Sequence, residues 1–140
     1  MAATLQPFKG RTYPRDEEIL LMIKHLKFAS IPTSDQERAL AFWTEKMGFK
    51  VMTDQPMGNQ RWIELGLPGS QTGIVLFTPE GHEDRIGTFF NGSFHCDDVD
   101  HTYRQLTDRG VEISAPEKQP WGTFARFRDP DGNTFILSGR

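Results

Sequence analysis

The sequence predicts an α+β protein built from two tandem copies of a strand–helix–strand–strand–strand module. The first observation is an offset of 62 residues that relates three pairs of landmarks: Asp35 and Asp97, Gly48 and Gly110, and Pro68 and Pro130. The second is that each half has a strand-like stretch before the Asp and a helix-like stretch between the Asp and the Gly. Because each landmark also has a local role in a cap or a turn, we interpret the offset as an internal repeat.

The composition is that of a soluble globular domain. The 140 residues, 36% hydrophobic and 25% charged, suffice for one domain with a proper core. The net charge of -3, with scattered Lys and Arg, gives no electrostatic footprint for nucleic acid. The longest apolar run, 19–23, is too short to cross a membrane, and the first residues lack a signal-peptide pattern. The single cysteine, Cys96, fits a reducing compartment, so we expect a cytoplasmic protein that binds neither nucleic acid nor membrane.

The repeat divides the chain into an arm and a domain. Residues 1–21 have no counterpart in the repeat and are interpreted as an N-terminal arm. Residues 22–140 form the domain, with modules at about 22–79 and 87–140. Residues 79–86, which are polar and charged, link the two modules.

The first module begins with a predicted strand at 23–31. Ser34 or Asp35 can cap the following helix, which buries residues at i, i+3 and i+7 spacing and ends at Gly48, a residue suited to a left-handed cap. The buried positions are Leu40, Trp43 and Met47. Three further strands are predicted from runs of β-branched and aromatic residues and from turns: 49–53, 60–65 and 73–78.

The second module follows the same plan. A strand at 88–96 precedes a helix that Asp97 or Asp98 can cap and that ends at Gly110. The remaining predicted elements are a strand at 111–114, a loop at 115–120 and a hairpin of 121–128 and 133–137 around Asp129-Pro130-Asp131-Gly132. Neither half can bury both faces of its own sheet. We therefore expect the modules to form one curved, cup-shaped mixed β-sheet with helices on its convex side.

Two motifs resemble those of a known family. The run from Ile31 to Phe49, IPTSDQERALAFWTEKMGF, resembles the first helix of the vicinal oxygen chelate superfamily, which includes glyoxalase I, bleomycin resistance proteins and extradiol dioxygenases. The turn Asp129-Pro130-Asp131-Gly132-Asn133 resembles the one before that family's last strand. The resemblance extends from about Met22 to Leu137 and implies the fold, but it does not specify a reaction.

The resemblance also implies where a metal would bind. Enzymes of the family hold a divalent ion in the cup with four His, Gln or Glu side chains, and the equivalent positions here are Phe28, Val75, Asn91 and Ile136. Three of these side chains cannot ligate a metal, and Asn91 alone will not hold one. We therefore expect no metal cofactor. The alternative is a non-standard site built from His95 and Glu64, which are also the weak candidates for catalytic residues.

Without a metal, the cup is an apolar and aromatic pocket suited to a small molecule. The residues predicted to contact the ligand are Phe28, Trp62, Glu64, Phe77, Asn91, His95, Trp121, Phe124, Arg126 and Ile136. Trp62 and Phe124 are related by the offset of 62, as are Glu64 and Arg126. For each aromatic residue the alternative is ordinary core packing, and for Arg126 it is a plain surface position.

Three hypotheses for function follow. The leading one is a glyoxalase/bleomycin resistance-like protein that binds a small, partly aromatic organic molecule without metal. The second is a metal-dependent lyase, isomerase or dioxygenase with the non-standard site, and the third is a non-catalytic interaction module with a filled cup. We expect a homodimer in each case, because family cups are often completed by a second subunit and a curved sheet leaves exposed edges.

Overall fold

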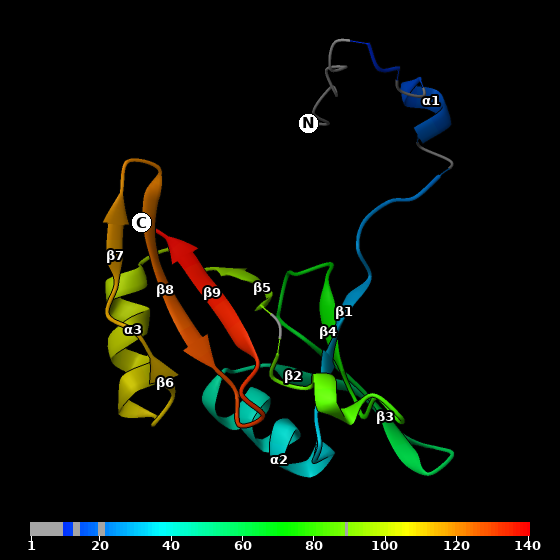
Figure 1. Cartoon of the computed structure of the whole chain (residues 1–140). Coiled ribbons are helices and arrows are strands. Elements are labelled where there is room, and N and C mark those ends of the chain that lie inside the picture. The colour runs from blue at the N-terminus through cyan, green and yellow to red at the C-terminus, as the bar shows by residue number, and fades with distance from the viewer. Residues whose placement is uncertain (1–9, 13–14, 20–21, 89) are drawn as a thin grey trace.

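The computed structural model describes residues 10–12, 15–19, 22–88 and 90–140, without the side chains at positions 18, 19, 90 and 91. Figure 1 shows its elements, which follow one another as α1 (Asp16–Ile19), β1 (Phe28–Pro32), α2 (Gln36–Ala41), the π-helical η1 (Phe42–Lys46), β2 (Lys50–Met57), β3 (Gln60–Gly66), β4 (Gly73–Phe77), the 3-10 helix η2 (Glu83–Arg85), β5 (Phe90–His95), α3 (Val99–Asp108), β6 (Glu112–Ile113), β7 (Glu117–Gln119), β8 (Gly122–Arg128) and β9 (Thr134–Gly139).

Each half of the chain forms its own mixed sheet. The N-terminal sheet has the order β1-β4-β3-β2, and the C-terminal sheet has the equivalent order β5-β9-β8-β6, with β7 paired to β8. The first strand of each module is parallel to its last, and the other pairs are antiparallel. This equivalence confirms the α+β class and the two tandem modules. Hydrogen bonding divides the expected single sheet into two, because the modules associate by packing of a helix onto a sheet rather than by pairing of strands.

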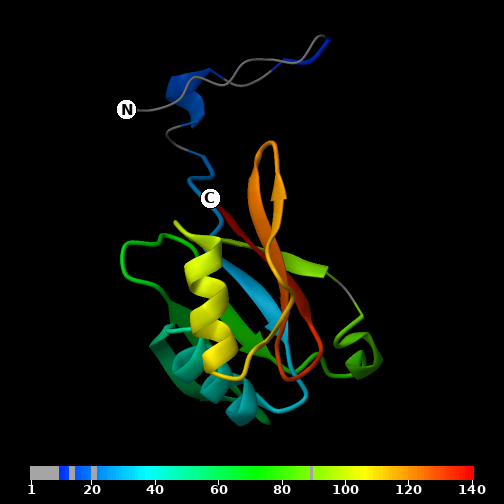
Figure 2. The same cartoon turned by 90° about the vertical axis from the view of Figure 1, so that its left-hand side faces the viewer.

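Both predicted helices are capped as their sequences indicate. The Asp35 carboxylate accepts a hydrogen bond from the Arg38 amide, and Asp98 does the same for His101. The helices are followed by Gly48 and Gly110, whose φ values of 85° and 80° are in the left-handed region that favours glycine. Figure 2 shows α3 in front of the strands.

Several boundaries differ from the prediction, and the strand predicted at 49–53 is the longer β2, Lys50–Met57. The strand predicted at 23–31 begins only at Phe28, because its partner β4 begins at Gly73, directly opposite Phe28. The predicted loop at 115–120 contains β7, which forms a further antiparallel pair with β8. The strand predicted at 88–96 is β5, Phe90–His95.

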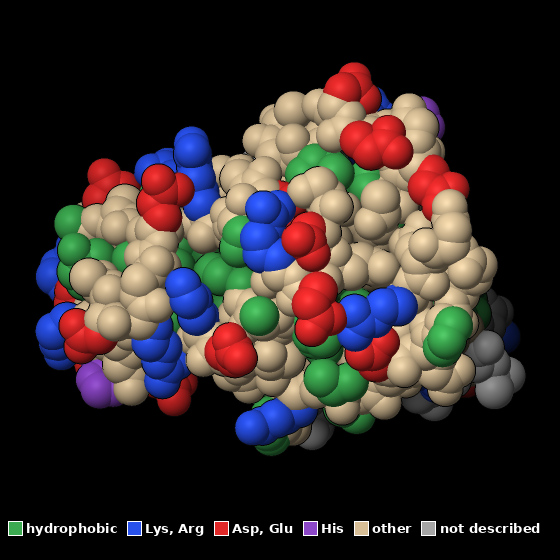
Figure 3. Space-filling model, turned by 90° about the horizontal axis from the view of Figure 1, so that it is seen from below, with side chains coloured by type: hydrophobic (Ala, Val, Ile, Leu, Met, Phe, Trp, Pro, Cys, Tyr) green, Lys and Arg blue, Asp and Glu red, His purple; other side chains and the backbone are tan. Residues whose placement is uncertain are grey.

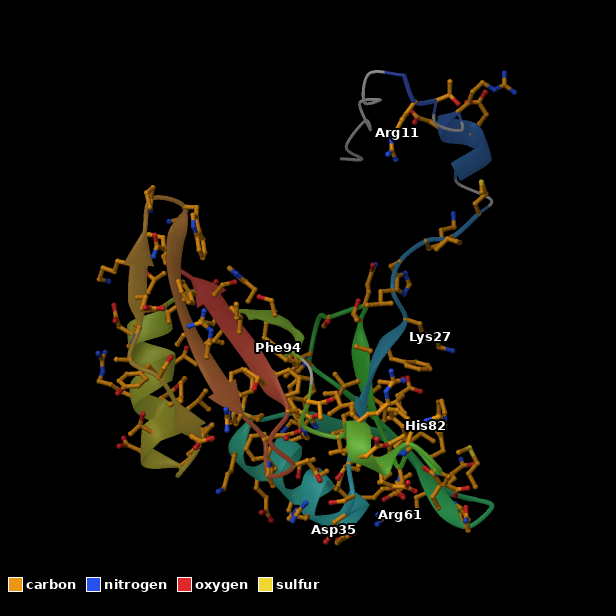
Figure 4. The ribbon with its side chains drawn as sticks, viewed as in Figure 1. Arg11, Lys27, Asp35, Arg61, His82 and Phe94 are labelled. Atoms are coloured by element: carbon orange, nitrogen blue, oxygen red, sulfur yellow. The ribbon has the colours of Figure 1, made fainter. Side chains whose placement is uncertain are left out.

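The described part of the N-terminal arm lies apart from the two sheets (Figure 1). Arg11, labelled in Figure 4, is exposed, as are the residues from Met22 to Lys27 that lead into β1. Among the described helices, none is long and apolar enough to cross a membrane. The face shown in Figure 3 mixes acidic and basic side chains, without a large patch of one sign.

The core is organised around the completely buried ring of Trp43, in η1. Phe42 and Phe49 contact this ring from the first half, and three rings from the C-terminal sheet surround it: Phe94, Phe127 and Phe135, at centroid distances of 5.7, 6.3 and 5.2 Å. The helix of the first module therefore packs on the sheet of the second. This packing joins the two halves into one core.

A second contact between the halves is polar. The turn between β8 and β9 places Asp131 at the start of α2, where its carboxylate accepts hydrogen bonds from the Thr33 hydroxyl at 2.6 Å and from the Ser34 amide and hydroxyl at 2.9 and 2.7 Å. Arg38 also donates to it, at 2.9 Å. Burial alone would raise the pKa of Asp131, but these hydrogen bonds and the Arg38 charge outweigh burial and hold that pKa below its ordinary value.

The same turn is braced from within by Asn133 and Asp129. Asn133 is buried and donates its side-chain amide to the Pro32 carbonyl at 2.8 Å and to the Asp129 carboxylate at 2.9 Å. Burial raises the pKa of the Asp129 carboxyl, against the hydrogen bonds from Asn133. The predicted turn thus connects the end of the second module to the first strand and helix of the first module.

We predict that Asp131→Asn destabilises the protein in a pH-dependent way. A buried carboxylate with four donors is lost, so the free energy of unfolding at pH 7 should fall by about 2–4 kcal/mol, measured by urea denaturation. Because the pKa of Asp131 is lowered in the folded protein, its stabilising effect is present above the ordinary carboxyl pKa and is lost as the pH falls. The gap between wild type and variant should therefore narrow towards pH 3.

The matched control for this prediction is Asp84→Asn. Asp84 is an exposed carboxyl in η2 that forms no ion pair within the described part of the chain. This variant should unfold within about 0.5 kcal/mol of wild type. An equal loss in the two variants, or a gap that is constant with pH, would contradict the assigned role of Asp131.

We also predict that the two faces of β8 differ in their contribution to folding. Phe127 is fully buried against Trp43, whereas Phe124, on the opposite face, is only partly buried. Phe127→Ala should therefore lower the free energy of unfolding, measured by urea denaturation, by about 3–5 kcal/mol, and Phe124→Ala should lower it by only about 1 kcal/mol. A comparable cost at both positions would show that both faces of β8 are packed as a core.

Candidate ligand-binding site

Each sheet has a face that packs into the core and an opposite face, here called the outer face. Alternation of side chains along the strands separates the two sets. In the N-terminal sheet the core-facing side chains include Ile31, Ile63 and Leu76, and in the C-terminal sheet they include Phe127 and Leu137. The predicted ligand contacts in β1, β3, β4, β5, β8 and β9 have the opposite parity, so they belong to the two outer faces.

On the N-terminal sheet, the outer face carries one aromatic pair. The rings of Phe28 and Trp62 meet edge to face, with their centroids 5.5 Å apart. Glu64 is the register partner of the buried Val75, and Phe77 lies two residues further along the same strand as Val75. This face therefore offers two rings, a half-buried edge of Phe77 and one carboxylate.

On the C-terminal sheet, the outer face carries a continuous stack of three side chains. The indole of Trp121, which is 67% exposed, stacks on the ring of Phe124 with a centroid distance of 5.6 Å and an interplanar angle of 18°. The Arg126 guanidinium carbon is 5.2 Å from the centroid of the Phe124 ring. Ile136 is the register partner of Arg126. Phe124 and Arg126 alternate along β8 as the sequence predicts, whereas Trp121 lies in the turn before β8 and stacks on Phe124 from there.

Two charged residues have partners that the sequence analysis did not assign. Arg126 lies 3.7 Å from the carboxylate of Glu117, a residue of the unpredicted strand β7, and no ion pair joins it to Glu64 in the described chain. His95, at the end of β5, is 76% exposed in its side chain, and its Nε2 is 3.5 Å from the Asp97 carboxylate. Both partners are exposed carboxylates, so a ligand can displace either ion pair at small cost.

Near His95 the C-terminal outer face is hollowed. A pocket of about 300 Å³ is lined by His95, Trp121, Ser138, Gly139 and Arg140. Two of the ten predicted contact residues, His95 and Trp121, therefore line the same pocket. Asn91 belongs to β5, but its side chain is outside the described residues.

The positions that hold the metal in the family do not fit a metal ion here. Phe28, Val75 and Ile136 offer only hydrocarbon, and among the described residues no three His, Cys, Asp or Glu side chains come together. His95 and Glu64 lie on different sheets. No reaction step through a metal follows from this arrangement.

A larger cavity, of about 770 Å³, lies between the two halves on the core side of the sheets. Of the predicted contact residues whose side chains are described, His95 lines it. Arg109, Gln105 and Thr102 line the same cavity from α3 and its C-terminal end. This cavity could not be predicted from the sequence, because it depends on how the two modules pack, which periodicity within each module does not reveal.

Comparison with known proteins agrees with this architecture. The model of the Glyoxalase/Bleomycin resistance protein/Dioxygenase superfamily matches residues 23–137. "Uncharacterized protein YetH" of Bacillus subtilis (strain 168) is 36% identical over 121 residues, which cover 83% of this chain and 98% of that protein.

Two solved structures are similar in both sequence and fold. The crystal structure of TnmS3, an antibiotic binding protein from Streptomyces sp. CB03234, has 37% identity and a TM-score of 0.75, covering 84% of this chain and 96% of that one. A superfamily member from Sphaerobacter thermophilus DSM 20745 has 36% identity and a TM-score of 0.71, covering 84% and 98%. On the matched family model, the relatives and the paired modules, the chain belongs to the Glyoxalase/Bleomycin resistance protein/Dioxygenase superfamily.

Proposed function

We propose that this protein binds a small, partly aromatic organic molecule on the outer faces of its sheets, without a metal ion. The stack of Trp121, Phe124 and Arg126 carries the proposal. An indole that is 67% exposed contributes little to folding, yet it is held parallel to a second ring. Such a surface offers a face to a flat aromatic ligand, and the guanidinium offers a charge to the ligand's polar groups.

The comparisons support the same class of ligand. TnmS3, which is 37% identical to this chain, is described as an antibiotic binding protein. Many antibiotics are organic molecules with fused or conjugated rings, and the aromatic surface in this chain suits that chemistry. We place the activity in the cytoplasm, where the single Cys96 would remain reduced.

We further propose that the complete site is formed by a homodimer. The Phe28–Trp62 pair and the Trp121–Phe124 stack lie on different sheets, and within the described chain no ring contact joins them. In a two-fold dimer, the N-terminal outer face of one subunit and the C-terminal outer face of the other would enclose the ligand from both sides. The exposed strand β2 supports association, since Val51 and Met52 are apolar and 49% and 65% exposed.

The dimeric site predicts complementation between two inactive variants. A thermal-shift screen of aromatic antibiotics first identifies a ligand, because a molecule that binds only the folded state raises the unfolding midpoint. Trp62→Ala and Phe124→Ala should each weaken binding of that ligand about tenfold or more. Mixed dimers of the two variants, formed by co-expression, should recover one intact site per dimer in a calorimetric titration.

Each outcome of this experiment has a distinct meaning. Homodimers of either variant alone should not recover binding, and they are the control. Loss of binding in both variants without recovery in the mixed dimer would place the site within one subunit. Unchanged binding in both variants would overturn the outer-face site altogether.

The metal-free part of the proposal is tested separately. Salts of Mn, Fe, Co, Ni and Zn should leave the thermal midpoint within about 1 °C of the metal-free value, because hydrocarbon side chains occupy the family's ligand positions. Elemental analysis of protein purified without affinity metal should give well under one ion per chain. One tightly held ion per chain that is lost in His95→Ala and Glu64→Gln would instead establish the non-standard metal enzyme.

A further inference from the structure

The 770 Å³ cavity between the two halves has the dimensions of a small-molecule site in its own right. Its walls are mainly apolar and come from both modules: Ile31 and Ile74 from the N-terminal sheet, Phe94 and Leu137 from the C-terminal sheet, and Leu106 from α3. Figure 4 labels Phe94, which lies where the two halves meet. Most of these walls are on the core side of the sheets, and His95 lines both this cavity and the hollow on the C-terminal outer face.

The charge at the cavity is of one sign. Among the described residues, no aspartate or glutamate lines it, although the chain as a whole has a net charge of -3. Arg109, directly after α3, lines the cavity, and its Nη1 donates a hydrogen bond to the Lys46 carbonyl at 2.8 Å. A guanidinium has five N–H donors, so most of them remain available.

A second cation lies beside the first. The Lys46 ammonium would be only 3.7 Å from a Cβ placed on Gly110, the neighbour of Arg109. Neither Arg109 nor Lys46 forms an ion pair with a carboxylate in the described part of the chain. Cations at helix C-termini interact favourably with the helix dipole, which accounts for their presence in the fold. It does not account for an open apolar cavity beside them.

We propose that this cavity binds an amphipathic organic anion. An apolar body would occupy the space between Ile31, Phe94 and Leu106, and a carboxylate or sulfonate would pair with the Arg109 guanidinium. Thr102 and Gln105, which also line the cavity from α3, offer further hydrogen bonds to the acidic group. This site does not depend on the outer-face function and would act beside it.

The test uses two fluorescent molecules that share an aromatic body but differ in charge. 1-Anilinonaphthalene-8-sulfonate carries the acidic group, and N-phenyl-1-naphthylamine lacks it. In the full chain, Arg109→Gln should weaken sulfonate binding about tenfold or more, since a charge-assisted pair is lost. The affinity for the neutral amine should change less than about twofold, because the apolar walls are untouched.

Matched variants locate the binding. Arg104→Gln makes the same change of charge on an exposed residue of α3 that does not line the cavity, and it should leave both affinities unchanged. Ala29→Trp fills the cavity from β1 and should remove binding of both molecules. Thr102→Trp fills it from α3, and this variant replaces Ala29→Trp if circular dichroism shows that the latter is not folded.

Three results would overturn the proposal. One is the absence of sulfonate binding to the wild-type protein. Another is an equal loss in Arg104→Gln and Arg109→Gln, which would indicate a general effect of charge. The third is binding that survives the cavity-filling variants but is lost in Phe124→Ala, which would place the anion on the outer face and leave the proposed function standing.

Discussion

The packing of Trp43 against the C-terminal sheet is the interaction on which the rest of the structure depends. A fully buried indole from the first module contacts three rings of the second, so neither module has a complete core without the other. Its Nε1 is buried without a hydrogen-bond partner in the described chain, a cost that the apolar contacts of the ring must offset. Asp131 of the second module also binds the N-terminus of this helical segment. The second module therefore contacts the segment through both polar and apolar groups.

This packing also determines which surfaces remain for binding. Because the core occupies one face of each sheet, the side chains of opposite parity are left to the outer faces, where rings such as Phe124 are only partly buried. The second consequence is the space between the modules. Trp43 joins the halves through Phe127 and Phe135, and Phe135 also borders the cavity together with Ile74 and Leu137. The outer faces and the cavity therefore both follow from the packing around Trp43, which does not extend along the whole boundary between the two modules.

The sequence predicts those features that depend on local chemistry. Asp35, Asp98, Gly48 and Gly110 set the helix limits through capping and positive φ, and alternation along β3 and β8 assigns Trp62 and Phe124 to the same kind of face. The sequence does not predict features that depend on contacts with other elements. Strand β7 is polar and exists because β8 is long enough to pair with it, and the Glu117 partner of Arg126 follows from that pairing. The division into two sheets and the cavity beside Arg109 arise from contacts across the repeat, which no periodicity within a module contains.

The repeat relates side chains on the outer faces of the two modules without involving the core. In a duplicated module, the same register places a pair of residues on equivalent outer faces, as with Trp62 and Phe124 or Glu64 and Arg126. A metal site needs several ligands to converge within bonding distance, and the side chains of Phe28, Val75 and Ile136 offer no ligand atom. Binding of an aromatic ligand has a weaker requirement, because each ring contributes area independently. The proposed stacking site therefore requires substitutions on the outer faces alone, which leave the Trp43 core and the Asp131 turn untouched.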